Sequence, residues 1–242
     1  MTLSCESGRT KPTARVQPIC AGRSKIFVTL STLKSQAFPL LFALVYAATL
    51  TSFPVDGFSD RANYLLYSQV SDVVLARFMS EGVHVALANE PLWRLINIFL
   101  DQFLDAEQIV RTIIFIPAFI VPYVLLKNNP QHAYWLVFFL LIPQVMKFHV
   151  IQLRQGVGIA MFLAGYYARQ RHVGLGLMGA AGFVHSSFLV ISLIGGTAWA
   201  IRKWRISPGL RITLFVTAFA ALGFSLQIIA IALGARQGER YL

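Results

Sequence analysis

VGLGLMGAAGFVHSSFLVISLIGGTAWA occupies residues 173–200, and the number of helices that it forms decides the fold. The stretch contains no charged residue, and His185 near its middle is its only polar ring. As a single helix it would be about 42 Å long, whereas the hydrocarbon core of a bilayer is about 30 Å thick. The sequence therefore leaves two alternatives, one overlong helix or a hairpin of two short helices that turns near His185.

The composition of the whole chain is that of a membrane protein. Of its 242 residues, 56% are hydrophobic and only 13% are charged, and the mean hydropathy is +0.63. Soluble domains carry about a quarter charged residues. Because the apolar residues fall in long runs, we predict an all-α, polytopic integral membrane bundle of about 6–7 membrane segments in one domain.

The pattern along the chain divides it into an arm and a membrane domain. Residues 1–36 are basic, and we expect a cytoplasmic arm that is disordered up to about residue 25. Its Cys5 and Cys20 have neither CxxC spacing nor histidine partners, so we expect free thiols. The membrane domain is predicted over 37–242. Residues 37–54 could be a signal-peptide core, but no small-x-small cleavage site follows, which favours a retained span. The further spans are predicted at 110–126, 132–148, 150–168, 173–185, 186–200 and 211–234.

Residues 55–108 differ from the rest because they hold eight of the chain's ten acids. Two parts of this segment, residues 59–79 and 90–104, have the apolar spacing of amphipathic helices. We therefore expect two helices that lie on, or dip into, the extracytoplasmic membrane surface.

The basic residues favour the hairpin over the single crossing. Lys and Arg collect on the cytoplasmic side of membrane proteins. A single crossing would place the basic cluster at 202–211 opposite Arg169 and Arg171. A hairpin instead puts 13 of the 21 basic residues on the cytoplasmic side and 8 outside, with a cytoplasmic N-terminus. The net charge of +11 then reflects orientation, and no nucleic-acid partner is expected.

Arg154 lies a few residues inside the apolar run FHVIQLRQGVGIAMFLAGYY, residues 148–167. A guanidinium keeps its charge and is expensive to hold in lipid. Arg154 could be a snorkelling flank residue, one half of a structural ion pair, or the group that binds an anionic substrate. Guanidinium forks donate in pairs and suit a diphosphate. Gly156 and Gly158 just after it allow close approach of a helix or ligand.

The hairpin would bring three candidate catalytic residues to the level of Arg154. Asp60 and Glu90 are candidate bases, although Asp60 could be only a helix N-cap and Glu90 only a first-turn acid. His185 is either a titratable catalytic group or a structural histidine bonded to a carbonyl or serine. The predicted substrate-binding residues, whose aromatic members could equally belong to an interfacial belt, are Arg154, Tyr64, Tyr67, Trp93 and Gln155.

The sequence lacks the motifs of metalloproteases, serine hydrolases and P-loop nucleotide enzymes. HExxH, GxSxG and P-loop motifs are absent, so we expect neither a metal nor a cofactor.

Four short motifs resemble the EpsG family of bacterial exopolysaccharide proteins, which is similar to Wzy-type polysaccharide polymerases. The motifs are D-x-x-x-Y at 60–64, E-P-L-W at 90–93, R-Q-G-V-G-I-A at 154–160 and F-V-H-S-S-F at 183–188. They follow the order of the family and cover about residues 40–242 as a set. Family members usually continue with further spans, so a truncated form or a fragment is expected here.

The resemblance implies a multi-pass protein of the bacterial inner membrane. It implies a glycosyltransferase-type polymerase that joins oligosaccharide repeat units carried on undecaprenyl diphosphate, on the outer side of that membrane. The implied partners are the polyprenyl-diphosphate-linked oligosaccharide, membrane lipids and other exopolysaccharide assembly and export proteins.

Such a transfer needs a base for the acceptor hydroxyl and a cation for the departing diphosphate. Asp60 or Glu90 would be the base, and Arg154, with His185, would meet the diphosphate. Two other functions stay open, a transporter or flippase of polysaccharide or lipid-linked sugar, and a non-catalytic scaffold of an export complex.

Overall fold

The computed structural model describes residues 24–58, 60–203 and 207–232, and these ranges are helical and contain no strand, which confirms the all-α fold class. The helices are α1 (Ser24–Thr51), η1 (Val55–Gly57), α2 (Arg61–Glu81), α3 (Val83–Ala88), α4 (Pro91–Asp101), α5 (Ala106–Asn128), η2 (Pro130–His132), α6 (Ala133–Leu140), α7 (Pro143–Val150), α8 (Leu153–Tyr166), α9 (Arg171–Val184), α10 (Ser187–Lys203) and α11 (Pro208–Ala232).

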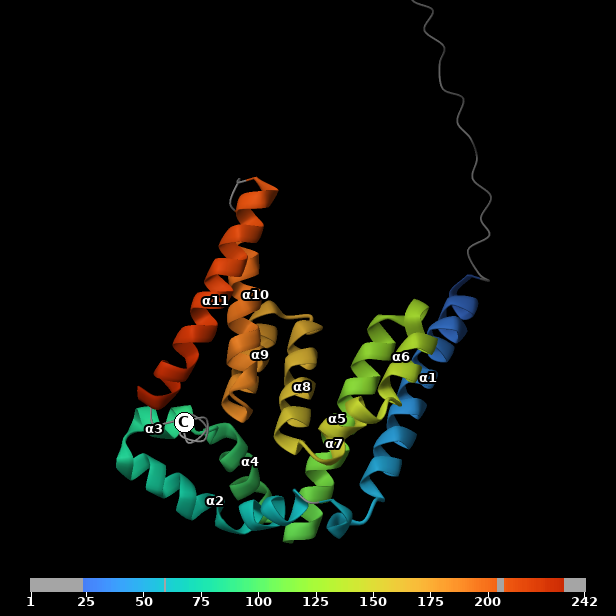
Figure 1. Cartoon of the computed structure of the whole chain (residues 1–242). Helices are drawn as coiled ribbons and strands as arrows, with labels where there is room; N and C mark the ends of the chain where they lie inside the picture. Colours follow the sequence, from blue (N-terminus) through green and yellow to red (C-terminus); the bar gives the residue numbers. More distant parts are fainter. Residues whose placement is uncertain (1–23, 59, 204–206, 233–242) are drawn as a thin grey trace, which may run out of the picture.

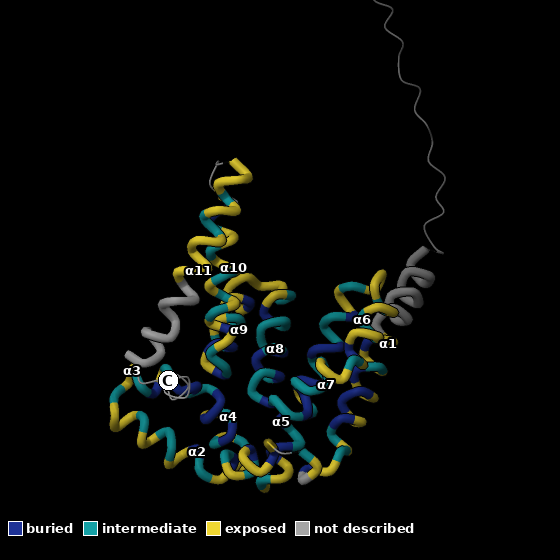
Figure 2. The backbone as a smooth tube through the Cα atoms, in the orientation of Figure 1, coloured by how far each residue is buried: buried dark blue, intermediate teal, exposed yellow. Residues whose placement is uncertain are grey.

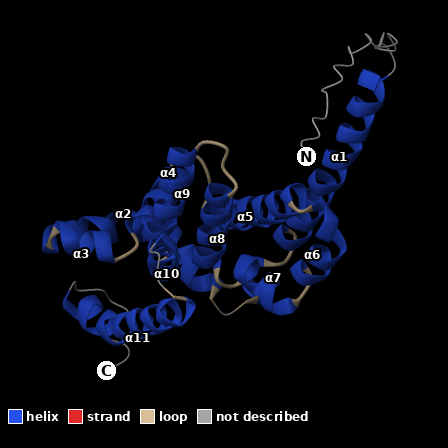
Figure 3. Ribbon diagram, turned by 90° about the horizontal axis from the view of Figure 1, so that it is seen from above, coloured by secondary structure: helices blue, strands red, loops and turns tan. Residues whose placement is uncertain are grey.

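The long helices stand side by side, and α2, α3 and α4 lie across one end of them (Figure 1). Seen from above, α8 lies between α5 and α9, and the pairs α1–α5, α5–α8 and α8–α9 pack directly (Figure 3). Buried backbone is concentrated in α1, α4, α5 and α8, whereas α10 and the described part of α11 are largely exposed (Figure 2). The core therefore lies on the side of α1, α5 and α8 and reaches into the layer formed by α2–α4.

The stretch 173–200 forms two helices, as the hairpin alternative predicts. Helix α9 ends at Val184 and α10 begins at Ser187, with His185 between them in an extended conformation (φ −151°, ψ 124°). The backbone nitrogen of Leu189 lies 3.4 Å from the position that a Cβ on Gly182 would occupy. Residues seven apart on one straight helix would be separated by about 10 Å. The chain therefore turns back at His185.

Two predicted spans have other bounds or another shape in the structure. Helix α1 (Ser24–Thr51) begins before the predicted span at 37–54, and the expected disorder lies almost entirely outside the described residues. The predicted span at 132–148 is not one straight helix, because α6 and α7 meet at an angle of 78°. Pro143 explains this bend, since it disfavours helix at Ile142 and is well tolerated as the first residue of α7.

One helix of the described ranges is both long enough and apolar enough for a complete membrane span. By length and composition, α5 is the one helix of the described ranges that could cross a bilayer, and the bent pair α6–α7 would make a second if it counts as one span. Helices α8, α9 and α10 have 14, 14 and 17 residues, fewer than the about 20 that a perpendicular span needs. The break at His185 accounts for the short length of α9 and α10, but not for that of α8.

The acidic residues of the described ranges lie at one end of the bundle, whereas basic residues lie at both ends. The end where α8 meets α9 and α10 meets α11 carries basic residues, namely Lys127, Arg169, Arg171, Lys203 and Arg211. The opposite end holds the layer of α2–α4, with the acids that the sequence places in 55–108. The first turn of α8 and the break at His185 lie at this acidic end.

Candidate functional site

Three predicted residues meet where the layer of α2–α4 contacts the bundle. Nη1 of Arg154 lies 2.5 Å from Oε2 of Glu90, and Nδ1 of His185 lies 2.7 Å from Oε1 of the same carboxylate. Glu90 is 64 residues from Arg154 and 95 from His185 in the chain. The fold therefore assembles one cluster from the α3–α4 corner, the start of α8 and the α9–α10 break.

Glu90 has an unusual backbone conformation. Its φ and ψ are both 56°, and it is the only non-glycine residue with positive φ among those described. Pro91 follows as the first residue of α4 and disfavours a right-handed helical conformation at Glu90. A left-handed conformation costs about 1–2 kcal/mol for a residue with a Cβ. Its side chain makes no cap hydrogen bond to α4.

Arg154 is the second residue of α8, and its side chain is 30% exposed. The ion pair with Glu90 corresponds to the second of its three predicted roles. Its guanidinium carbon also lies 5.7 Å from the centre of the Tyr67 ring. The two glycines that follow it bring helices close: a Cβ at Gly156 would lie 2.5 Å from the Phe148 carbonyl oxygen, and one at Gly158 would collide with the Phe188 ring.

His185 connects the carboxylate to a side-chain amide. Its Nε2 lies 3.1 Å from Nε2 of Gln155, on the opposite side of the ring from Glu90. An ionised carboxylate can only accept, so Nδ1 of His185 donates to Glu90. Nε2 is then the accepting nitrogen and receives the hydrogen bond from the Gln155 amide. This is the tautomer in which Nε2 can take a proton from a substrate.

The surroundings of Glu90 hold its carboxyl group in the charged form. Burial alone would raise its pKa, but the hydrogen bond from His185 and the charge of Arg154 together lower the pKa below its usual value of 4.5. Both oxygens already accept hydrogen bonds. Glu90 is therefore a weak base in this arrangement, and its geometry suits orienting His185 and Arg154.

The aromatic residues near the cluster are largely buried. Tyr64 and Trp93 are buried, at 7% and 2% exposure, and their rings pack 5.8 Å apart. Neither has a free face for a sugar in this state. Tyr67 is half-buried, and its ring is approached by the guanidinium of Arg94, at 6.0 Å, as well as by that of Arg154.

Asp60 does not join the cluster. It is exposed at the N-cap position of α2, makes no cap hydrogen bond, and has no ion pair with the described residues. Sequence reasoning missed Arg94 and the backbone N–H of Ser186, which lies 3.4 Å from Oε1 of Glu90. The sequence does contain a signal for Arg94, because it is a charged residue that directly follows Trp93 and is surrounded in the sequence by apolar residues.

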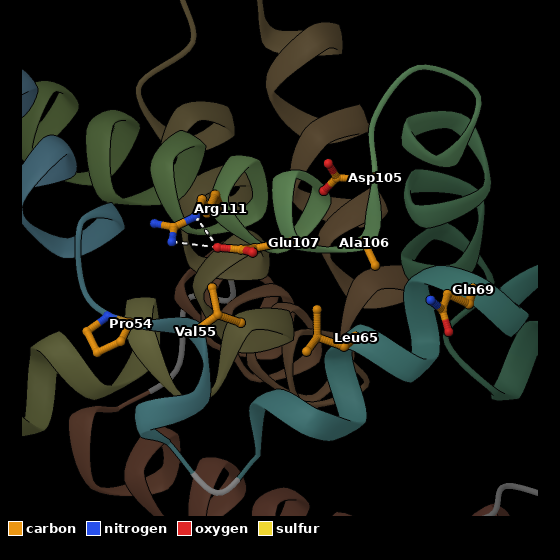
Figure 4. Close-up of a pocket in the computed structure, with 8 residues that line it drawn as sticks. All are labelled: Pro54, Val55, Leu65, Gln69, Asp105, Ala106, Glu107 and Arg111. Atoms are coloured by element: carbon orange, nitrogen blue, oxygen red, sulfur yellow. Dashed lines mark hydrogen bonds and ion pairs between the residues drawn. The ribbon is translucent and has the colours of Figure 1, made fainter.

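A separate hollow of about 560 Å³ lies between η1, α2 and the start of α5 (Figure 4). Its polar lining includes Gln69, Asp105 and the ion pair of Glu107 with Arg111, whose Nη2 and Oε1 atoms are 2.6 Å apart. None of the predicted site residues lines it. The Glu90 cluster and this hollow are therefore distinct features.

Comparison of the chain with models of protein families, with curated proteins and with solved structures found no match. In the described part of the chain, no three His, Cys, Asp or Glu side chains are grouped so that they could hold a metal ion.

Proposed function

We propose that this chain is a multi-pass protein of the bacterial inner membrane that resembles the EpsG family and acts as a polysaccharide polymerase. It would join oligosaccharide repeat units carried on a polyprenyl diphosphate, at the outer membrane surface. The observation that carries this proposal is the cluster of Glu90, Arg154 and His185. These residues belong to three of the four motifs on which the resemblance depends, and Arg154 and His185 both contact Glu90.

The cluster supplies the two groups that glycosyl transfer needs. Once the acceptor hydroxyl has replaced the Gln155 amide at Nε2 of His185, that nitrogen takes the hydroxyl proton while the hydroxyl oxygen attacks the anomeric carbon. The bond from that carbon to the diphosphate breaks, and the diphosphate leaves with the electron pair. Arg154 stabilises its negative charge. Before substrate binds, Glu90, held ionised, keeps His185 in the required tautomer.

The distribution of charge supports the proposed orientation and the 6–7 membrane segments. With the basic end in the cytoplasm, the acidic layer and the cluster face outward, as the positive-inside rule requires. In this proposal the short helices α8, α9 and α10 complete their crossings by packing against one another and by local thinning of the bilayer. The exposed aromatic face of α6, with Tyr134 at 92% and Trp135 at 75% exposure, suits a membrane interface near the basic end.

The decisive experiment is complementation of a deletion strain with Arg154→Ala and His185→Ala variants, followed by measurement of polymer length. Both variants are expected to leave single repeat units on the lipid carrier. Arg77→Ala and His84→Ala are matched controls, because both residues are exposed in the acidic layer and outside the cluster. Full-length polymer from both cluster variants at normal expression would refute the proposal and favour a scaffold.

The same strains separate a polymerase from a flippase. Repeat-unit lipid should accumulate in the outer leaflet if polymerisation fails, whereas accumulation in the inner leaflet identifies transport as the lost step. Orientation is tested by cysteine labelling in a variant without Cys5 and Cys20. A membrane-impermeant maleimide should reach Asp60→Cys in intact cells, and it should reach Arg169→Cys only after permeabilisation.

A further inference from the structure

The contacts of the Glu90 carboxylate are those of a bound anion. Three donors converge on it: Nη1 of Arg154, Nδ1 of His185 and the backbone N–H of Ser186, just before α10. All three donors come from α8 and the α9–α10 break. The carboxylate comes from the separate α3–α4 corner. The bundle therefore provides a site for an anion, and the Glu90 carboxylate, which belongs to the layer of α2–α4, occupies that site.

Such a set of donors matches a phosphate group at least as well as a carboxylate. A guanidinium donates in pairs to phosphate oxygens, and a backbone N–H at the start of a helix adds a partial positive charge. A diphosphate carries more charge than the single charge of Glu90. A second guanidinium lies nearby: the guanidinium carbon of Arg94 is 6.0 Å from the centre of the Tyr67 ring, which Arg154 also approaches.

The occupant is held on a strained backbone. Glu90 is 6% exposed, and its left-handed conformation is unfavourable for a residue with a Cβ. Departure of the carboxylate from the donors would let the α3–α4 corner relax. The energy of that relaxation partly offsets the loss of the hydrogen bonds.

We propose that Glu90 is a tethered occupant of a phosphate-binding site and that the diphosphate of the substrate displaces it. The structure then represents a resting state, in which the anion site is closed until ligand arrives. The identity of the ligand as a lipid-linked diphosphate depends on the proposed function. The displacement itself depends only on the three donors and on the strained corner.

Removal of the tethered charge should therefore increase affinity for phosphate compounds. The test is calorimetric titration of the purified full-length chain in detergent with inorganic pyrophosphate. Glu90→Gln removes the charge at almost constant volume, and Glu90→Asn does so with a residue that adopts the left-handed conformation more readily. Each should bind pyrophosphate at least about tenfold more tightly than the wild type, because a hydrogen-bonded charged competitor has been removed.

Two further variants make the result specific. Glu81→Gln removes an exposed acid of the same layer and should leave the affinity unchanged. Addition of Arg154→Ala to Glu90→Gln should abolish the gain. The inference is overturned if neither Glu90 variant, both folded by circular dichroism, binds more tightly than the wild type, or if the gain survives loss of Arg154.

A second ligand distinguishes a lipid-linked diphosphate from a free anion. Farnesyl diphosphate should bind more tightly than pyrophosphate to Glu90→Gln if a polyprenyl diphosphate is the natural ligand. Equal binding would contradict the lipid-linked substrate, and with it the proposed function, while the displacement of Glu90 would stand. A second combination of results would lead to the same conclusion. If Glu90→Gln binds pyrophosphate more tightly, as expected, but the Arg154→Ala strain makes polymer of normal length, the proposed function is contradicted and the displacement of Glu90 stands.

Discussion

Replacement of Glu90 by alanine and by glycine separates its two energetic contributions, the buried ion pair and the backbone strain. Glu90→Ala removes the partner of Arg154 and His185 and keeps the strained conformation. Hydrogen bonds to charged groups contribute about 1.5–3 kcal/mol each. Because the Arg154 side chain is 30% exposed and partly solvated, the lower end of that range applies, and the two bonds together give about 3 kcal/mol.

Glu90→Gly loses the same bonds but relieves the strain at φ 56°. Relief of a left-handed conformation returns about 1–2 kcal/mol, and the greater freedom of glycine in the unfolded chain costs about 0.5–1 kcal/mol. The glycine variant should therefore be about 1 kcal/mol more stable than the alanine variant. This order is the reverse of that expected at an ordinary helical or extended position.

Thermal unfolding in detergent, followed by circular dichroism, measures both variants. For a chain of this size, about 3 kcal/mol corresponds to a fall in Tm of about 6–12 °C for Glu90→Ala. Glu90→Gly should recover about 2–4 °C of that loss. If the glycine variant melts at or below the alanine variant, the strain assigned to Glu90 is absent. If neither variant melts below the wild type, the cluster contributes nothing to stability.

Three further predictions concern stability. Because the pKa of Glu90 is lowered in the folded state, its contribution to the free energy of unfolding is fully present above its usual pKa of 4.5. That contribution is lost as pH falls through the lower folded-state pKa. The decline in Tm at acidic pH should therefore be shallower in Glu90→Gln than in the wild type. Gly158→Ala should cost about 1–3 kcal/mol through collision with the Phe188 ring, whereas Gly176→Ala, which faces open space, should cost nothing measurable in the same melts. Arg61→Lys should cost about 2 kcal/mol, because the buried guanidinium donates to three backbone carbonyls that an ammonium cannot reach together. An unchanged midpoint concentration in a denaturant titration would contradict this.

The sequence predicted the fold best where an apolar run was too long for one membrane span. The run at 173–200 was too long for one perpendicular span and had a polar ring at its centre, and the structure breaks there. A proline such as Pro143 indicates a bend but not its angle, which is 78° here, because a proline prevents a regular helix without specifying the direction of the next one. The bend depends on how α6 and α7 pack against their neighbours.

The candidate site was predicted as a set of residues but not as a set of contacts. Charge counting brought Arg154, His185 and the acids to one end of the bundle. It could not select Glu90 over Asp60, since both precede a helix and both are acidic. The selection depends on the corner before Pro91, where the backbone turns the Glu90 side chain into the bundle while Asp60 remains exposed.

The cluster forms at helix ends for a physical reason. Glu90 precedes α4, Arg154 is in the first turn of α8, and His185 lies between α9 and α10. Helix ends carry backbone N–H and C=O groups without intrahelical partners, so they are the places in an apolar bundle where polar side chains find partners. A charged residue in the middle of a short apolar helix would have to be buried without such partners. This chain has few charged residues. The helix ends that lie together at Glu90, Arg154 and His185 are therefore the part of the bundle best suited to bind or transform a charged ligand.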